Sequence, residues 1–179
     1  MFSAIAATAP LPELHRSKIL PGRQVAYESS WRVLYFRIDA HSRLLMGGPS
    51  AQRESRGSDD HQHLVAHAER IFPELKGVAW QHVWNGQVAV TRDHYPHLHE
   101  PARGVIAALG YNGRGVAMAT AMGRIVSRRI LGAPPEELEL PISDFKSFPL
   151  RRFWRPIVEA AQIKYLFADR LRRIARTLA

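Results

Sequence analysis

The stretch of sequence that decides the fold lies late in the chain, where residues 104–132 read GVIAALGYNGRGVAMATAMGRIVSRRILG. A short apolar run, Val105–Leu109, is followed by glycines at positions 110, 113 and 115 and then by a long run of small and apolar residues. This order predicts a buried strand, a tight turn, and a helix over Val116–Leu131 that ends at Gly132. Glycines in such a turn let the backbone approach a ligand closely, and the helix start points free N–H groups toward it.

Neither of the common nucleotide-binding signatures is present in this turn. A GxGxxG that starts at Gly113 needs a glycine at position 118, which is Met118, and no acidic residue that ends a second strand follows. The Gly-Lys-Ser/Thr of a P-loop is also absent. Two interpretations therefore stay open from these residues alone: a turn that binds a ligand through its backbone, and a turn that only packs.

The composition is that of a folded protein with one sizeable domain or parts of two. The chain has 179 residues, of which 46% are apolar and 23% charged. The absence of cysteine excludes disulfides, thiolate metal ligands and cysteine nucleophiles. No run approaches the roughly 18 apolar residues that a membrane span needs, and the opening residues lack the basic start of a secretory signal. We therefore expect a cytoplasmic protein without a membrane span.

Much of the net charge of +9 lies in the last thirty residues, LRRFWRPIVEAAQIKYLFADRLRRIARTLA. The simplest interpretation is the solvated face of a helix that begins near Pro156 and packs through Ile157, Ala161 and Tyr165. A basic tail can also bind an anionic membrane or nucleic acid. Because the tail lacks the aromatic interleaving of a nucleic-acid module, we expect no nucleic-acid partner.

The first hundred residues predict strands around one helix. Strand-like composition marks residues 2–8 and 24–28, and Trp31–Ile38 has Arg43–Met46 as its expected hairpin partner. A helix with apolar positions from Leu64 to Phe72 is expected to be capped by Asp59 or Asp60. The dipeptide Asn85-Gly86 predicts a hairpin between the extended runs 78–84 and 87–91.

The nine histidines gather mainly in HQHLVAH (61–67) and HYPHLH (94–99). His63 and His67 have the spacing of zinc ligands on a helix, but the glutamate of an HExxH motif is replaced by Leu64. We therefore expect surface histidines and no metal site.

Three segments carry a family resemblance: YFRIDAHSRLLMGG (35–48), IFPELKGVAWQHVWNGQVAVTRDHYPHL (71–98) and GVIAALGYNGRGVAMATAMGRIVSRRI (104–130). In this order they resemble the D-amino-acid-oxidase-like family of FAD-dependent oxidoreductases, above all its amine-oxidising branch, typified by gamma-glutamylputrescine oxidoreductase. The match runs from about Phe2 to Leu150. The N-terminal half of such enzymes, which carries GxGxxG, has no counterpart here, so the chain resembles the C-terminal half alone.

The resemblance implies a mixed α+β and α/β fold, namely part of an FAD-oxidoreductase fold. Residues 1–103 would form the antiparallel sheet of the substrate domain with one main helix, and 104–133 the terminal strand–turn–helix of the FAD-binding domain. From the residues themselves, 134–179 are expected to form a proline-rich connector and a basic amphipathic helix. FAD is the implied cofactor, and the residues implied to line its isoalloxazine are Gly110, Tyr111, Asn112, Gly113, Arg114, Gly115 and Val116.

The implied reaction is oxidation of a small-molecule amine by hydride transfer to the flavin, with oxygen or another acceptor taking the electrons. No strong base is required, and no catalytic residue is assigned. Amino-acid-oxidising members usually carry an arginine carboxylate clamp shortly after Trp-x-Gly, where this chain has Gln87 and Val88, with Arg92 further on. An amine without a carboxylate on the reacting carbon fits better. Tyr35 and Trp84 are expected either as pocket walls or as plain core.

Two alternatives remain open at the level of sequence. The chain could be a non-catalytic remnant, or a subunit that needs a separate chain bearing the dinucleotide-binding half. A basic membrane- or nucleic-acid-associated module ranks last, because it rests on the tail only.

Overall fold

The computed structural model describes residues 1–29, 33–145 and 151–177. The chain forms two compact units, which are described separately. The sheet unit consists of residues 2–87 and 153–179, and the turn unit consists of Met1 and residues 88–152. Residues 88–103, which the sequence analysis grouped with the first hundred, thus belong to the same unit as the glycine turn.

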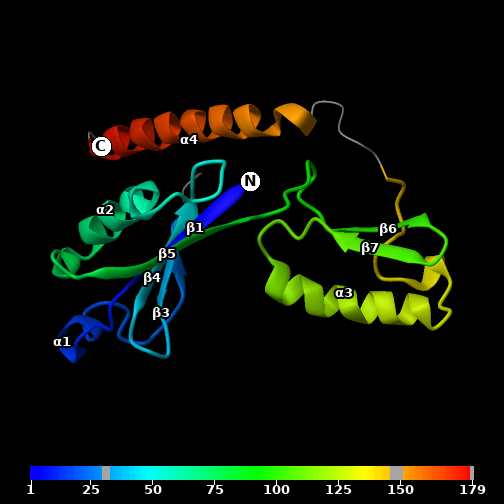
Figure 1. The fold of residues 1–179 in the computed structure, drawn as a ribbon, viewed down its shortest axis with the longest axis horizontal. Coiled ribbons are helices and arrows are strands. Elements are labelled where there is room, and N and C mark those ends of the chain that lie inside the picture. Colours follow the sequence, from blue (N-terminus) through cyan, green and yellow to red (C-terminus); the bar gives the residue numbers. More distant parts are fainter. Residues whose placement is uncertain (30–32, 146–150, 178–179) are drawn as a thin grey trace. The chain divides into compact units, whose positions relative to one another are not determined.

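The sheet unit is built on a five-stranded antiparallel sheet in the order β2-β3-β4-β1-β5 (Figure 1). Its strands are β1 (Phe2–Thr8), β2 (Ala26–Tyr27), β3 (Tyr35–Ile38), β4 (Leu44–Pro49) and β5 (Trp80–Gln87). Of the strand predicted over Trp31–Ile38, the part Tyr35–Ile38 is confirmed as β3 and forms the expected hairpin with β4, with Ile38 opposite Leu44 at the turn end. Trp31 lies outside the described residues. The first strand lies between β4 and β5 and pairs with both along its length.

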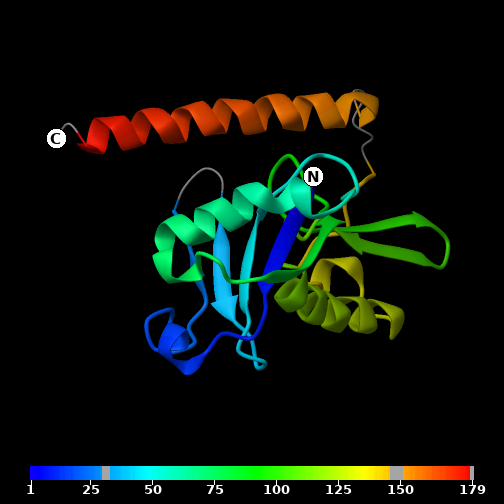
Figure 2. The same ribbon diagram turned by 60° about the vertical axis from the view of Figure 1, so that its left-hand side comes forward.

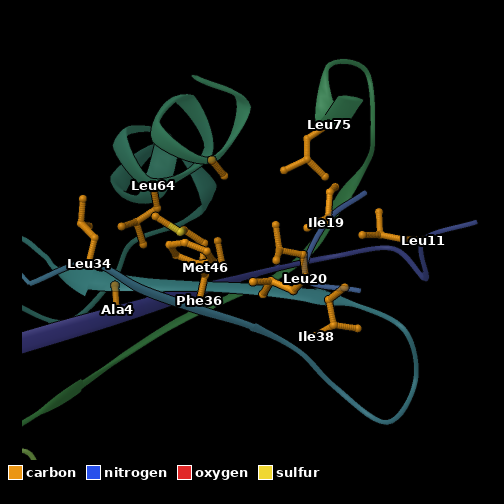
Figure 3. Close-up of a cluster of buried hydrophobic side chains, with 13 residues drawn as sticks. Ala4, Leu11, Ile19, Leu20, Leu34, Phe36, Ile38, Met46, Leu64 and Leu75 are labelled. Carbon is orange, nitrogen blue, oxygen red and sulfur yellow. The ribbon is translucent and has the colours of Figure 1, made fainter. Parts of the chain in front are cut away.

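One face of this sheet is covered by α2 (Gln62–Ile71), which follows a 3-10 turn over Ser58–His61. Leu64 and Ala68 of α2 are fully buried against apolar residues of the strands, because strand residues of one parity all face the helix. Figure 3 shows Leu64 pointing toward Met46 and Phe36. The buried cluster consists of Ala4, Ala6, Leu11, Ile19, Leu20, Leu34, Phe36, Ile38, Leu44, Met46, Leu64, Ala68 and Leu75.

Two buried polar side chains satisfy backbone groups at the ends of β1. Gln52 accepts a hydrogen bond from the N–H of Phe2 at 3.0 Å through Oε1 and donates to the carbonyl of Ser50 at 2.8 Å. At the other end, Thr8 Oγ1 accepts the N–H of Leu44 at 2.9 Å, where the register between β1 and β5 shifts. These bonds fix β1 at both ends, because a buried backbone group left without a partner is costly.

The remaining helices of the sheet unit are α1 (Glu13–Arg16), a 3-10 turn over Pro73–Leu75, and α4 (Trp154–Thr177). The Trp154 ring stacks on Phe2, with ring centroids 6.4 Å apart. Ala161 and Tyr165 are half-buried as expected, whereas Ile157 is 46% exposed. The side chains of Arg170, Arg172 and Arg173, which give the tail much of its charge, lie outside the described residues.

The turn unit consists of an antiparallel hairpin, β6 (His97–Ala102) and β7 (Val105–Leu109), packed on α3 (Gly115–Ile130) (Figure 2). Its core is formed by Leu98, Met122, Ile125 and Leu138. Short 3-10 turns cover Pro135–Glu137 and Arg151–Phe153. The expected fold class, an antiparallel sheet plus a terminal strand–turn–helix, is confirmed. The strand β7 is less buried than expected, because Val105 and Leu109 at its ends are 47% and 39% exposed.

The hairpin predicted at Asn85-Gly86 is wrong, because β5 runs without a break through both residues. Pairing with β1 holds it straight, and the Asn85 side chain is used elsewhere. Its Nδ2 donates to the carbonyl of Arg53 at 2.8 Å, and its Oδ1 accepts the N–H of Ser55 at 3.0 Å. Contacts thirty residues distant in sequence thus override the local turn preference.

The predicted cap of α2 is also wrong. His61 occupies the N-cap position, and the helix has no side-chain cap among the described residues. The Asp60 carboxylate instead accepts hydrogen bonds from both Nη atoms of Arg53, each at 2.6 Å, and from the N–H of Arg56 at 2.9 Å. The bidentate arginine holds the pKa of Asp60 down to about 2.

Replacing Leu64 by alanine tests the core of the sheet unit. The side chain has no exposed surface, so Leu64→Ala should lower the free energy of unfolding by about 2–5 kcal/mol. Leu14→Ala is the matched control, because Leu14 is 70% exposed and should change the stability by about 0.5 kcal/mol or less. Urea denaturation followed by tryptophan fluorescence measures both, and equal effects would contradict the packing described.

Candidate functional site

The glycine turn joins β7 to α3 through three residues with positive φ. The φ values are 79° at Gly110, 53° at Asn112 and 83° at Gly113, and the helix begins at Gly115. No helix crosses residues 111–114. The strand–turn–helix expected from the sequence is therefore confirmed.

Asn112 ties the turn to residues 89–91, which lie before β6. Its N–H donates to the carbonyl of Ala89 at 3.2 Å, and its Oδ1 accepts the N–H of Thr91 at 2.9 Å. Its Nδ2 donates to Thr91 Oγ1 at 3.1 Å and to the carbonyl of Gly110. Asparagine suits this position because it tolerates the left-handed conformation and bonds to nearby backbone. Sequence reasoning named Asn112 but missed Thr91 as its partner.

The three glycines of the turn differ in the space around the position that a Cβ would occupy. A Cβ on Gly110 would lie 2.4 Å from Thr91 Cγ2, so this glycine allows close packing within the unit. A Cβ on Gly113 would meet nothing within 4 Å, and one on Gly115 would meet only a Tyr111 ring carbon at 3.7 Å. Gly113 and Gly115 therefore leave the backbone open on the outer side of the turn.

The first turn of α3 presents backbone donors that have no partner within the helix. Arg114 is the N-cap residue, and no side chain among the described residues caps the helix there. The carbonyl of Arg114 accepts the N–H of Met118 at 3.0 Å, so the N–H groups of residues 115–117 precede the first helical bond. Val116 is 95% exposed. This surface fits a carbonyl or another group with partial negative charge, such as the pyrimidine edge of a flavin, because the positive end of the helix dipole lies there.

The flanking side chains of the turn are fixed within the turn unit. The Arg114 guanidinium donates to the carbonyl of His94 at 2.9 Å, and the Tyr111 hydroxyl donates to the carbonyl of Ala108 at 3.2 Å. Both side chains therefore serve the packing of the turn, and the free surface is mainly backbone.

Asp93 orders the loop of residues 91–97 that contacts the turn. Its Oδ1 accepts the N–H of Tyr95 at 3.2 Å and contacts His97 Nε2 at 3.2 Å. The backbone N–H of Tyr95, followed by His97, holds the pKa of Asp93 down to about 2. Threonine and aspartate side chains often bond to nearby backbone and so favour turns. The sequence Thr-Arg-Asp at 91–93 could therefore have predicted this loop, but the sequence analysis did not use it.

A second candidate surface is the sheet face opposite α2. Tyr35 pairs with Gly47, Gly47 with Ile5, and Ile5 with Trp84, so these four residues form one row across β3, β4, β1 and β5. They alternate with core residues along each strand, so they point away from α2. Tyr35 and Trp84 are therefore not part of the buried core, and the structure brings them onto one face.

The row has a defined surface. The Tyr35 ring lies against Gly47, where a Cβ would come within 2.1 Å of Tyr35 Cε2. The Tyr35 hydroxyl shares a hydrogen bond with Ser3 Oγ at 3.2 Å, which holds the ring over β4 toward β1. Ile5 is half-buried and Trp84 is 44% exposed. An apolar floor with an aromatic residue at each end results.

Comparison with known proteins identifies the family. Residues 2–129 match the FAD dependent oxidoreductase family, DAO. The chain belongs to this family. The family resemblance seen in the sequence is thereby confirmed, and FAD is the cofactor of the family.

Individual relatives agree with this assignment. The chain is 33% identical over 158 residues to the probable oxidoreductase OrdL of Rhizobium meliloti (strain 1021), a match that covers 86% of this chain and 36% of that protein. It is 27% identical over 129 residues to gamma-glutamylputrescine oxidoreductase of Escherichia coli (strain K12), covering 72% of this chain and 30% of that protein. The chain thus spans about a third of the length of the curated relatives it matches.

Solved structures share the fold. Iminodiacetate oxidase (IdaA) from Chelativorans sp. BNC1 superposes with a TM-score of 0.60 at 16% identity, over 85% of this chain and 38% of that one. Glycine oxidase from Geobacillus kaustophilus superposes with a TM-score of 0.57 at 19% identity, over 85% of this chain and 37% of that one. At these identities the likeness concerns the fold alone.

Two further observations limit the kinds of site present. Among residues 1–29, 33–145 and 151–177, no three histidine, aspartate or glutamate side chains gather as metal ligands would. In the same part of the chain, no helix has the length and apolar character to cross a lipid bilayer.

Substitutions at Asn112 separate its side-chain bonds from its backbone conformation. Asn112→Gly keeps the positive φ but removes the bonds to Thr91, so local opening should become easier by about 1–3 kcal/mol. Asn112→Ala should lower the free energy of local opening by about 1 kcal/mol more than Asn112→Gly does, because alanine disfavours the left-handed region. Hydrogen exchange at the Thr91 amide measures both, with the amides of β1 as an unaffected control. Unchanged exchange at Thr91 in Asn112→Gly would refute the role of the side chain.

The low pKa of Asp93 predicts the pH range in which the loop loosens. Because its pKa falls from 3.8 to about 2 in the folded state, the charged carboxylate stabilises the loop above about pH 4. This contribution is lost as the pH falls through the folded pKa. NMR signals of loop amides 94–97 should titrate with a midpoint near pH 2, and Asp93→Asn should abolish this step. A midpoint near pH 4 in the unmodified protein would contradict the contacts described.

Proposed function

We propose that this chain supplies the flavin-contacting turn and the substrate-facing sheet of an FAD-dependent oxidoreductase that oxidises an amine. The observation that carries this proposal is the open backbone of Gly113 and Gly115 beside an uncapped helix start, in a chain that belongs to the FAD-dependent oxidoreductase family.

The proposed flavin-binding residues are those of the turn and the start of α3. The N–H groups of residues 115–117 would hold a flavin carbonyl oxygen, and their fixed orientation would stabilise the negative charge that develops there on reduction. Gly110, Asn112 and Arg114 would position this backbone through their contacts within the turn unit. The complete set is Gly110, Tyr111, Asn112, Gly113, Arg114, Gly115 and Val116. When bound, FAD supplies a two-electron acceptor for the conversion of an amine to an imine.

The sheet face offers an apolar surface for the substrate. Tyr35 and Trp84 would bound the pocket, and the floor between them would exclude water from an uncharged amine. Orientation of the deprotonated amine is the main task of these residues, since no base on this chain is required. Oxygen or another acceptor would then reoxidise the enzyme.

The chemistry near β5 favours an amine over an amino acid. The positions where a carboxylate clamp would lie are Gln87, the last residue of β5, and Val88. Arg92 is exposed in the loop of the turn unit. An amine with no carboxylate on the reacting carbon therefore fits best, and a gamma-glutamylputrescine-like substrate agrees with the name of one relative, which is 27% identical.

A second candidate is a subunit or non-catalytic remnant that requires a separate chain with the dinucleotide-binding half. The specific observation is that the match covers only about a third of the relatives' length. Apolar surface on the turn unit also favours a partner, because Val116, Ile130 and Leu131 are 95%, 70% and 86% exposed.

An absorbance spectrum between about 350 and 500 nm, where oxidised flavin absorbs, tests the proposed function. The chain alone should retain FAD only weakly, because a few backbone hydrogen bonds of about 1 kcal/mol each barely offset the several kcal/mol lost on immobilising a ligand. Adding a polypeptide with the GxGxxG half should restore retention. Stoichiometric FAD on the isolated monomer, or none with both halves together, would contradict the proposal.

Substitution of Gly115 tests the turn itself. With the GxGxxG half present, Gly115→Val should abolish flavin retention, because the side chain would fill the open side of the turn while the φ of this residue remains ordinary. Gly113→Val should do the same, with added strain from its φ of 83°. Gly22→Val is the matched control, since its Cβ would meet only a flexible glutamine side chain. Full retention in Gly115→Val, with the turn intact by hydrogen exchange, would exclude the assigned contact.

A further inference from the structure

The sheet face that carries Tyr35 and Trp84 also carries the guanidinium of Arg37. Arg37 lies two residues after Tyr35 on β3, so both side chains leave the sheet on the same side. Arg37 is exposed, and among the described residues it has no ion pair or hydrogen bond. Three other arginines of the sheet unit differ in this respect, since Arg16, Arg43 and Arg53 each pair with a carboxylate.

None of the described strand residues on this face carries a carboxylate that could neutralise Arg37. The described strand residues that share its face are Ser3, Ile5, Ala7, Tyr27, Tyr35, Leu45, Gly47, Pro49, His82, Trp84 and Gly86, and none is acidic. The nearest acid along β3 is Asp39, which accepts hydrogen bonds from Arg43 Nε at 2.8 Å and from the N–H groups of His41 and Arg43. The face therefore holds an unneutralised cation beside an apolar floor.

The sheet register sets the distance between the cation and the aromatic row. Arg37 is opposite Leu45, Leu45 is opposite Ala7, and Ala7 is opposite His82, so these four residues form a second row across the sheet. This second row lies two residues along the strands from the row that contains Tyr35 and Trp84. Two residues along a strand span about 7 Å, and three strand spacings span about 14 Å. A ligand whose amine lies on the aromatic row would thus reach Arg37 with a group several bonds from the amine carbon.

We propose that Arg37 binds a carboxylate at the far end of the amine substrate and so determines specificity. The substrate class is an extended amine with a distal carboxylate, such as a gamma-glutamyl amine. A guanidinium suits this role because its planar fork binds a carboxylate through two parallel hydrogen bonds. The assignment explains how a chain with Gln87 and Val88 at the clamp position can still recognise an acid. It rests on the proposed function and adds the substrate class to it.

The test compares two amines that differ at the end distant from the reacting carbon. Gamma-glutamylputrescine carries there an amino acid group with the carboxylate, and N-acetylputrescine has the same aminobutyl amide without that group. In the FAD-loaded complex of this chain with a polypeptide that carries the GxGxxG half, Arg37→Gln should raise KM for gamma-glutamylputrescine by about tenfold or more, the worth of hydrogen bonds to a charged group. KM for N-acetylputrescine and kcat for both should stay within about twofold of the unmodified protein. Arg37→Lys should recover part of the loss, and Lys76→Gln, which removes an exposed charge elsewhere in the sheet unit, should have no effect.

A binding measurement separates this inference from the proposed function. Calorimetric titration of the protein with gamma-glutamylputrescine requires no turnover, and Arg37→Gln should weaken that binding by about tenfold or more. If neither amine is oxidised but binding depends on Arg37, the proposed reaction fails and the carboxylate site stands. If both are oxidised and Arg37→Gln affects them equally or not at all, the carboxylate site fails and the reaction stands. Absence of both oxidation and binding would overturn both.

Discussion

The pairing of β1 with strands on both sides is the constraint on which the sheet unit depends. This strand joins β4 to β5, which lie more than thirty residues apart in sequence, and its alternation assigns each neighbouring residue to one face. Ala4 and Ala6 face α2, and their small size lets Leu64 pack closely against the sheet. Ser3 and Ile5 face the other way. A shift of one residue would exchange the two faces, so the bonds of Gln52 and Thr8 at the strand ends also protect the candidate substrate surface.

The glycine turn shows how one sequence motif can serve packing and binding together. Gly110 is needed because Thr91 fills the space that a side chain would occupy, and Asn112 closes the turn onto the same residue. Gly113 and Gly115 have no such neighbour on their open side. A ligand that lies there would contact backbone atoms alone, which agrees with an N–H surface that stabilises charge on a cofactor carbonyl. The chain belongs to the FAD-dependent oxidoreductase family, and we propose that the flavin is the ligand of this surface.

On the sheet face, the charged Arg37 and the apolar floor occupy separate places, and this separation favours a substrate that is charged only away from its reacting carbon. Tyr35, Ile5 and Trp84 provide a floor without charge, and Arg37 lies two residues further along the strands. An uncharged amine over the floor and an acid at the arginine would therefore occupy different parts of one extended molecule. In such an arrangement the reacting carbon bears no charge of its own, and recognition comes from the remote end of the substrate.

The sequence by itself determined the elements whose signals are local. The order of apolar run, glycines and small residues defined the strand, turn and helix around Gly113, and the β3–β4 hairpin followed from two apolar runs around Asp39 and its neighbours. The same segments carried enough resemblance to identify the family and its cofactor. Tertiary structure decided the features that involve partners distant in the chain. Asn85 is held in a straight strand by Arg53 and Ser55, and Asp60 is taken from the helix end by the same arginine. The common row of Tyr35 and Trp84 exists only because β4 and β1 lie between their strands, and no local pattern specifies which strands become neighbours.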